Sequence, residues 1–238
     1  MIFFRIYQVL IVIPTLVVAT IVASVVTIIM CAFTKGRFWG YYPAKIWAIL
    51  FCWLNFVSVK VDGRQNIDPK TSYVFVANHQ GAYDIFSLYG FLGHNFKWMM
   101  KSSLAKIPFV GYACRSSGHI FVDRTNANSI RQSMDKARKQ LSRGMSLVVF
   151  PEGSRSRTGR IGAFKRGAFF LATELSLPVV PITIDGAYNI LPRSTAFPRP
   201  GRITLTIHKP IEPDSEGHHD LNKLMETSKQ AIESGFKS

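Results

Sequence analysis

Residues 73–84 read YVFVANHQGAYD. The apolar run Tyr73–Ala77 predicts a buried strand, and the polar groups after it predict a turn that leads into a helix. His79 and Asp84 are five residues apart, so on a regular helix their side chains would be rotated by about 140° and would not share a face. They can meet only if His79 lies in the turn and Asp84 in the first helical turn. Gly81 makes such a turn sterically easy.

The pairing of His79 with Asp84 would create a base. Asp84 could hold one imidazole nitrogen and leave the other to take a proton from a hydroxyl group. Taken alone, the stretch also fits a lone histidine in a loop with an aspartate that opens a helix. Other parts of the chain have to decide between these two interpretations.

The composition indicates an anionic partner. The chain has 238 residues and a formal net charge of +15, from 29 Lys and Arg against 14 Asp and Glu. Nucleic acid, a membrane surface and a phosphorylated substrate all fit that imbalance, but we find no nucleic-acid reader motif and predict no nucleic-acid partner. Cys31, Cys52 and Cys114 are scattered, which fits neither a disulfide framework nor a metal site and is typical of a reducing compartment.

The first sixty residues differ from the rest and predict a membrane anchor. No charged residue occurs from Ile6 to Thr34, which is long enough to span a bilayer core of about 30 Å and too long for a signal peptide. The uncharged segment Ile46–Val59 is too short to span and suits an interfacial helix. Residues 1–60 are therefore expected to form either one spanning helix plus an interfacial helix or a monotopic two-helix hairpin.

The charges that flank the apolar segment indicate its orientation. Arg5 lies on one side, and Lys35, Arg37 and Lys45 lie on the other. Because Lys and Arg accumulate on the cytoplasmic side of membrane segments, we expect a membrane location with the catalytic domain on the cytoplasmic side.

Residues 61–238 predict one catalytic domain with an α/β fold. Apolar strand-like runs alternate with helical patterns, which favours a mixed, largely parallel sheet flanked by helices. Strands are expected at 57–61, 73–77, 97–100, 119–122, 147–150, 179–184 and 203–207. Helices are expected at 84–92, 108–116, 128–143, 165–175 and 221–233.

Two further loops after predicted strands carry charge where α/β proteins form their sites. One contains Asp123 and Arg124, and Arg124 is suited to clamp a phosphate with two hydrogen bonds. A structural Asp–Arg pair would have the same sequence. The other loop begins Phe150-Pro151-Glu152-Gly153-Ser154-Arg155.

The loop after Phe150 is strongly basic. Arginine and lysine recur through residues 155–166 without an acidic residue, which suits a loop that cradles an anion. Glu152 is expected to stay ionised beside so much positive charge and to accept hydrogen bonds from a hydroxylated substrate. A solvated basic loop or a patch on anionic lipid is the alternative.

Four blocks of this chain, taken in order, resemble the motifs of the glycerophospholipid acyltransferase family, of the 1-acyl-glycerol-3-phosphate (lysophosphatidic acid) acyltransferase type. The blocks are Asn78-His79-x-x-x-x-Asp84, Gly118-x-x-Phe121-Val122-Asp123-Arg124, Phe150-Pro151-Glu152-Gly153-Ser154-Arg155-Ser156 and Val180-Pro181-Ile182. The match covers roughly residues 73–186. Gly81 departs from it, since a small hydroxyl residue is more usual there, so position 81 receives no chemical role.

The resemblance implies a role for each site residue. His79 would be the general base and Asp84 its orienting partner; Arg124 and Lys101 would bind the acceptor phosphate; Glu152, Gly153 and Arg155 would belong to the acceptor pocket. The implied reaction moves an acyl chain from acyl-CoA or acyl-carrier protein to the 2-hydroxyl of lysophosphatidate and gives phosphatidate for phospholipid biosynthesis. No metal or other cofactor is expected.

The residues leave other functions open. No serine or cysteine lies in a Gly-x-Ser-x-Gly elbow, so a covalent acyl-enzyme is not indicated. The acceptor could be another lysophospholipid or lyso-lipid. The same histidine and aspartate could serve a hydrolase or phosphatase, and a membrane protein that only binds anionic lipid would need neither.

Overall fold

The computed structural model describes residues 2–34, 36–123, 127–141 and 144–237. Within these residues, seven strands form one sheet in the order β1-β7-β6-β2-β5-β3-β4. All neighbouring strands run parallel except β6 and β7, which are antiparallel. The strands are β1 (Val57–Asp62), β2 (Val74–Ala77), β3 (Phe96–Lys101), β4 (Ile120–Val122), β5 (Ser146–Val149), β6 (Val179–Asp185) and β7 (Gly201–Ile207). The predicted mixed, largely parallel sheet is confirmed.

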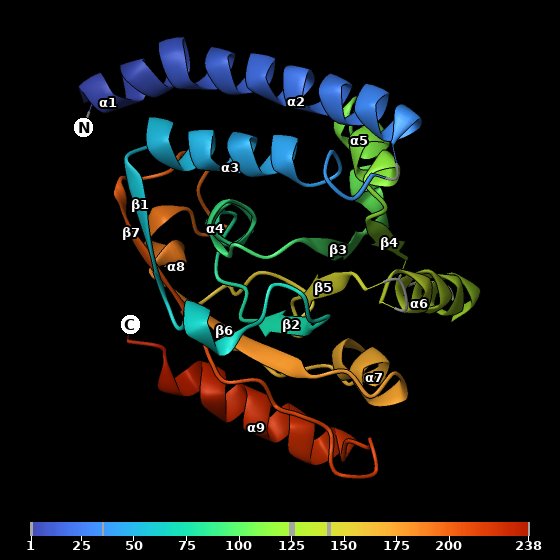
Figure 1. Cartoon of the computed structure of the whole chain (residues 1–238). Helices are drawn as coiled ribbons and strands as arrows, with labels where there is room; N and C mark the ends of the chain where they lie inside the picture. Colours follow the sequence, from blue (N-terminus) through green and yellow to red (C-terminus); the bar gives the residue numbers. More distant parts are fainter. Residues whose placement is uncertain (1, 35, 124–126, 142–143, 238) are drawn as a thin grey trace.

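Helices cover both faces of the sheet (Figure 1). One face packs against α3 (Tyr42–Leu54), α4 (Tyr83–Phe91) and α8 (Ala187–Ile190). The other packs against α6 (Ala127–Leu141), α7 (Gly167–Glu174) and α9 (Leu221–Ser234). The remaining short elements are α5 (Val110–Ser116) and the 3-10 helices η2 (Arg64–Asn66) and η3 (Ser102–Lys106).

The position of β2 in the middle of the sheet explains the apolar run Tyr73–Ala77. Val74 and Val76 face the core under α6, α7 and α9, while Phe75 and Ala77 face the core under α3 and α4. All four side chains are fully buried, so a continuous apolar run replaces the usual alternation. Since β2, β3 and β5 are parallel, the loops that follow them open at the same edge of the sheet.

The N-terminal helices lie outside these layers. α1 (Ile2–Tyr7), the π-helix η1 (Gln8–Val12) and α2 (Ile13–Phe33) form one helical run that lies along α3 (Figure 1). The π-helical stretch ends just before Pro14. Proline cannot donate a backbone hydrogen bond, and its ring crowds the preceding turn, so the wider turn accommodates it without breaking the run.

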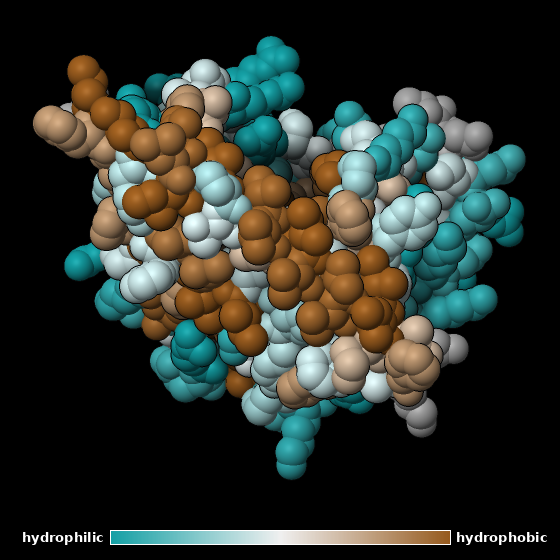
Figure 2. Space-filling view, turned by 90° about the horizontal axis from the view of Figure 1, so that it is seen from above, coloured by the Kyte–Doolittle hydropathy of each residue, from teal (hydrophilic) through white to brown (hydrophobic). Residues whose placement is uncertain are grey.

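This helical run is long and apolar enough to cross a membrane, and only 11% of its most apolar window is buried in the protein. Seen from above, a band of hydrophobic side chains covers this face (Figure 2). Its exposed members include Phe3, Leu10, Val18, Val22, Ile29 and Phe33, together with Ile46 and Trp53 of α3. Such a surface is typical of a membrane-associated protein. The division at residue 60 stays a prediction; β1, which contains that residue, pairs with β7 in the sheet.

Candidate active site

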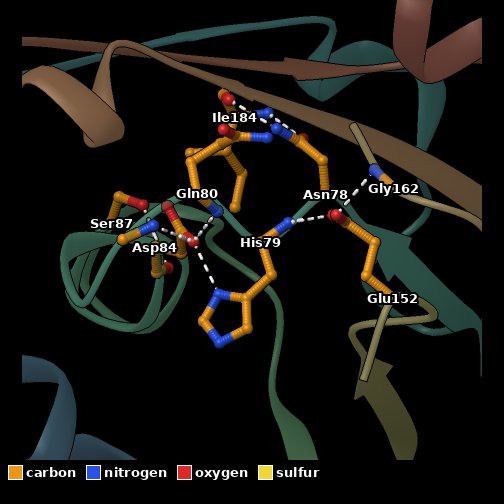
Figure 3. Close-up of polar contacts among 9 residues, drawn as sticks. Asn78, His79, Gln80, Asp84, Ser87, Glu152, Gly162 and Ile184 are labelled. Carbon is orange, nitrogen blue, oxygen red and sulfur yellow. Dashed lines mark hydrogen bonds and ion pairs between the residues drawn. The ribbon is translucent and has the colours of Figure 1, made fainter. Parts of the chain in front are cut away.

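His79 lies in the turn between β2 and α4, and Asp84 lies in the first turn of α4. Their side chains meet: His79 Nδ1 is 2.7 Å from Asp84 Oδ2 (Figure 3). Asp84 is fully buried, whereas the His79 side chain is 13% exposed. The predicted pairing of the two side chains is therefore confirmed, with the histidine at the open side of the pair.

Backbone hydrogen bonds assign the proton of the His79 ring. Asp84 Oδ2 accepts hydrogen bonds from the N–H groups of Gln80 at 2.6 Å and Gly81 at 2.9 Å. Because those donors hold Oδ2 as an acceptor, the neutral imidazole donates from Nδ1 and keeps a lone pair on Nε2. In Figure 3 this second ring nitrogen points away from Asp84. The pair can accept a proton at Nε2.

Asn78 ties the start of the turn to β6. Its Nδ2 donates to the carbonyl of Ile184 at 2.8 Å, and its Oδ1 accepts from the Ile184 N–H at 2.7 Å. The side chain is fully buried, so this two-way bond to a neighbouring strand is strongly shielded from water. Asn78 is thus a positioning residue for the histidine that follows it, and only the tertiary structure reveals its partner.

Gly81 has a packing role as well as a turn role. A Cβ at this position would lie 2.8 Å from the carbonyl oxygens of both Ala187 and Leu191. Both carbonyls belong to backbone, which cannot move aside cheaply. The glycine lets the His79 turn approach α8, and this explains why a larger residue is missing here.

Glu152 occupies a different position from the one its sequence context suggests. Its Oε1 accepts the N–H of His79 at 2.7 Å, and its Oε2 accepts the N–H of Gly162 at 2.8 Å (Figure 3). Both carboxylate oxygens therefore bind backbone. These contacts form a clamp on the peptide of His79, and a further hydrogen bond from a substrate to Glu152 stays a prediction.

Burial dominates the electrostatics of Glu152. It raises the pKa of the carboxyl group above its ordinary value, and the N–H donors of His79 and Gly162 oppose that rise. The neighbouring arginines, which the sequence suggests as the main influence, are not among the causes. Two backbone donors favour the ionised form, so the hydrogen bonds that fix His79 are also the ones that support the charge of Glu152.

The loop after β5 fixes His79 by two more contacts. The Ser156 N–H donates to the His79 carbonyl at 2.7 Å, so both sides of the His79 backbone bond this loop. The Phe150 ring stacks on the imidazole, with centroids 3.9 Å apart and an angle of 9° between the planes, and Trp98 stacks on Phe150 in turn. We count Phe150 among the positioning residues; its place at the end of a predicted strand was the only hint in the sequence.

Lys101 lies at the same edge of the sheet as the turn of His79. Lys101 ends β3 and pairs in register with Val122, the last residue of β4, so it lies beside the start of the Asp123–Arg124 loop. Arg124 itself lies outside the described residues. Among the residues the structure describes, no ion pair involves Lys101 or Arg155. Both cations are available to an anion.

Gly153 has a conformational reason to be glycine. Its φ is +76°, in the left-handed region that other residues rarely adopt. Its N–H donates to the Phe150 carbonyl at 3.0 Å and closes the turn that follows β5. This turn places Glu152 beside His79. A direct contact of Gly153 with an acceptor stays a prediction.

The backbone amides of the turn are already used. The N–H of His79 donates to Glu152, and those of Gln80 and Gly81 donate to Asp84. A backbone N–H makes one strong hydrogen bond. In this arrangement, these three groups do not stabilise an oxyanion.

Comparison with known proteins places the chain in a family. The sequence model of the family described as Acyltransferase matches residues 58–185, slightly more than half of the chain. The chain belongs to this acyltransferase family. The matched segment runs from β1 to β6 and includes the turn of His79, the loop of Arg124 and the loop of Glu152.

Several proteins with similar sequences share the same enzyme name. This acyltransferase is 32% identical over 211 residues to a 1-acyl-sn-glycerol-3-phosphate acyltransferase of Chlamydomonas reinhardtii, covering 87% of this chain and 62% of that protein. It is 35% identical over 177 residues to a chloroplastic enzyme of the same name from Arabidopsis thaliana, covering 74% and 49%. For an enzyme of that name from Borreliella burgdorferi the identity is 30% over 183 residues, covering 76% and 70%. The chain spans about half to three fifths of the length of the algal and Arabidopsis relatives.

A crystal structure shares the fold. The 1-acyl-sn-glycerophosphate acyltransferase PlsC from Thermotoga maritima superposes with a TM-score of 0.67 and 24% sequence identity, covering 92% of this chain and 95% of that one. This likeness confirms the fold. For an acyltransferase, a buried Asp–His pair with an open Nε2 can remove a proton from an acceptor hydroxyl.

Proposed function

We propose that this acyltransferase moves an acyl chain from acyl-CoA or acyl-carrier protein to the 2-hydroxyl of lysophosphatidate, with His79 as general base. The observation that carries the proposal is the hydrogen bond from His79 Nδ1 to the buried Asp84, which leaves Nε2 as an acceptor. The names of the similar proteins support the choice of acceptor.

In the proposed reaction, His79 Nε2 takes the proton of the 2-hydroxyl as that oxygen attacks the thioester carbonyl carbon. A tetrahedral oxyanion forms and collapses, the carbon–sulfur bond breaks, and the thiolate leaves. The protonated imidazole then returns its proton to the leaving sulfur. Asp84 stabilises the imidazolium between these steps, as a carboxylate partner does for other histidine bases.

Positively charged groups at the same edge would hold the phosphate of the acceptor. Lys101 ends β3, and in the sequence Arg124 follows the neighbouring parallel strand β4 and Arg155 follows β5. Fixing the phosphate would orient the 2-hydroxyl toward His79, and orientation of this kind can supply a large part of a rate enhancement. We assign these three cations to acceptor binding.

We further propose that the N-terminal helices lie in one leaflet as a monotopic hairpin. α2 runs along α3, and α3 packs against α4 of the catalytic domain (Figure 1). The apolar run therefore extends across the domain instead of projecting from it, and its outer side chains are exposed. A hairpin in the cytoplasmic leaflet would give the active site direct access to a lysolipid and would release the diacyl product into the membrane.

The experiment is an acceptor and donor panel on the full-length protein in membranes or detergent. Lysophosphatidate is compared with lysophospholipids that carry a head group, each with acyl-CoA and with acyl-carrier protein. We expect turnover with lysophosphatidate and little with the others. Equal or greater turnover with a head-group acceptor would reject the proposed substrate, and thioester hydrolysis without acyl transfer would reject the reaction. His79→Ala is the background, and His218→Ala, at a 74% exposed side chain, is the matched control.

A further inference from the structure

Lys97 is an unusual lysine. It lies in β3 with 3% of its surface exposed, and its Nζ has no hydrogen-bond partner within the part of the chain that the structure describes. Lysine is rarely buried without a partner, because an ammonium group taken from water must be compensated. An ammonium left in this state points to a group that the chain itself does not supply.

A pocket of about 510 Å³ opens beside Lys97. Its lining residues come from the segment between α2 and α3, from β3, from the turn between α5 and β4, and from the end of α6 and the loop after it. Its lining residues are Gly36, Arg37, Lys97, Ser116, Ser117, Gly118, Gln140 and Met145. None of these described residues is acidic. A Cβ on the nearby Gly40 would clash with the Gly36 carbonyl oxygen and lie 3.3 Å from Lys97 Nζ, so glycine here lets the backbone approach the ammonium closely.

The pocket is separate from the candidate active site. Lys97 lies near the amino end of β3 and pairs in register with Leu147, which pairs with Val74 at the start of β2. Lys101 ends the same strand four residues later, which is about 13 Å at ~3.3 Å per residue. His79 follows the far end of β2. Lys97 is therefore not part of the proposed acceptor clamp.

The charges around Lys97 favour an anion. Burial lowers the pKa of Lys97 to about 8; the Cys31 thiol opposes this shift and the positive charge of Arg37 adds to it. At neutral pH the ammonium is still mostly protonated. His119, which accepts the Trp98 N–H at Nδ1, is neutral, because burial and the positive charge of Lys97 lower its pKa to about 3. The residues facing Lys97 thus offer positive charge and neutral groups.

We propose that this pocket is a second anion site that binds a phosphate group, as a monoester or as free phosphate, with Lys97 as the buried cation and Arg37 at the mouth. Two cations match the charge of about −1.5 to −2 that a phosphate monoester carries near pH 7 better than the single charge of a carboxylate. The Gln140 amide and the Ser116 hydroxyl can add neutral donors to its oxygens. Since Gly36 follows the apolar helical run, the phosphate belongs either to a lipid head group or to free phosphate.

The test follows Lys97 directly in the full-length protein by NMR with lysine labelled at Cε. Loss of one resonance in Lys97→Met assigns the signal. Inorganic phosphate is titrated in detergent, and nanodiscs of phosphatidylcholine with and without phosphatidate are compared in phosphate-free buffer. We expect a saturable shift of the Lys97 signal and a rise of its pKa above the value near 8. A response to phosphate identifies a soluble ligand, and a response only to phosphatidate identifies a lipid head group.

Three further variants keep the proposal testable if Lys97→Met does not fold. Arg37→Ala, at an exposed residue, should weaken phosphate binding on the order of tenfold, the loss of a charge-assisted contact, while the Lys97 signal stays visible. Lys106→Met, an exposed lysine outside the pocket, should change nothing. Lys101→Met should also leave the Lys97 response intact, which separates this site from the acceptor clamp. A Lys97 signal that neither phosphate nor phosphatidate moves would overturn the proposal.

Discussion

The loop after β2 and the loop after β5 face each other but hold their polar groups in different ways. In the first loop, Asn78 and Asp84 are fully buried and bond backbone of their surroundings. In the second loop, the arginines are half-buried or exposed, and the structure gives Arg155 no ion pair within its described residues. The second loop reaches the first through the Glu152 carboxylate, the Phe150 ring and backbone groups.

The difference separates two physical tasks. A proton transfer needs a base whose ring orientation and protonation are fixed, so His79 sits in a buried network. Anion capture needs charge that is accessible and not yet neutralised, so the arginines of the second loop stay solvated. Variants in the two loops should therefore change different kinetic quantities. Substitutions in the first loop should lower kcat, whereas substitutions of the basic residues in the second loop should raise the KM for the acceptor.

The largest expected effect comes from His79→Ala. Removing a general base lowers the rate by a factor on the order of 10²–10⁴. We expect a loss of kcat at the upper end of that range, because Asp84, Phe150 and Glu152 all hold His79 in place. The acceptor KM should change little. The measurement is steady-state acyl transfer with purified protein. Retention of more than about a tenth of the wild-type kcat would remove His79 as the base.

Substitutions at Asp84 separate the effect of its negative charge from the effect of its hydrogen bonds. In Asp84→Asn, the N–H groups of Gln80 and Gly81 should hold the amide oxygen toward His79, as they now hold Oδ2. The correct tautomer then survives and only the negative charge is lost. We expect kcat to fall by about 10², less than for His79→Ala, with the fold intact by circular dichroism.

Asp84→Ala removes the acceptor itself. Two buried N–H groups lose their partner at a cost of about 1–3 kcal/mol each, so the thermal unfolding temperature should fall well below that of Asp84→Asn. If the two variants lose equal activity and equal stability, the backbone bonds to Asp84 do not orient His79.

Much of the fold follows from the sequence because its signals are local. Every predicted strand matches an observed one to within two residues at each end, since buried strands are short apolar runs bounded by turn residues. α8 was missed because a single turn over Ala187–Ile190 has no measurable periodicity. The strand order, and the antiparallel β6–β7 pair, depend on how distant segments associate and have no local signal.

The site shows the same limit at the scale of side chains. His79 and Asp84 could be paired from their spacing because five residues of chain restrict their geometry. Glu152 could not be placed in this way: it lies 73 residues from the peptide it holds. Its basic neighbours in the sequence suggested a contact with substrate, whereas the fold brings backbone donors nearer to both of its oxygens.

Glu152→Gln tests the clamp between the two loops. Glutamine keeps one acceptor but turns an NH₂ group toward the N–H of His79 or Gly162, so one bond becomes a contact between donors. A small displacement of His79 should lower kcat by about tenfold, since misplacement by as much as 1 Å can cost 10². The acceptor KM should stay within about twofold. A large rise in KM with unchanged kcat would instead place Glu152 in contact with the acceptor.

The smallest expected effect comes from Arg155→Ala. This side chain is half-buried beside the loop that holds His79, and its loss should raise the KM for lysophosphatidate by about three- to tenfold, the range of one partly solvated charge contact. Because exposed charges are screened by salt, the difference from wild type should shrink as ionic strength rises. Arg157→Ala is the matched control: its side chain is exposed, and the contact made by this residue uses its backbone carbonyl, which accepts from Tyr188 at 3.1 Å. If both variants raise KM equally, the second loop attracts the acceptor by its overall charge, and Arg155 has no specific place in the phosphate site.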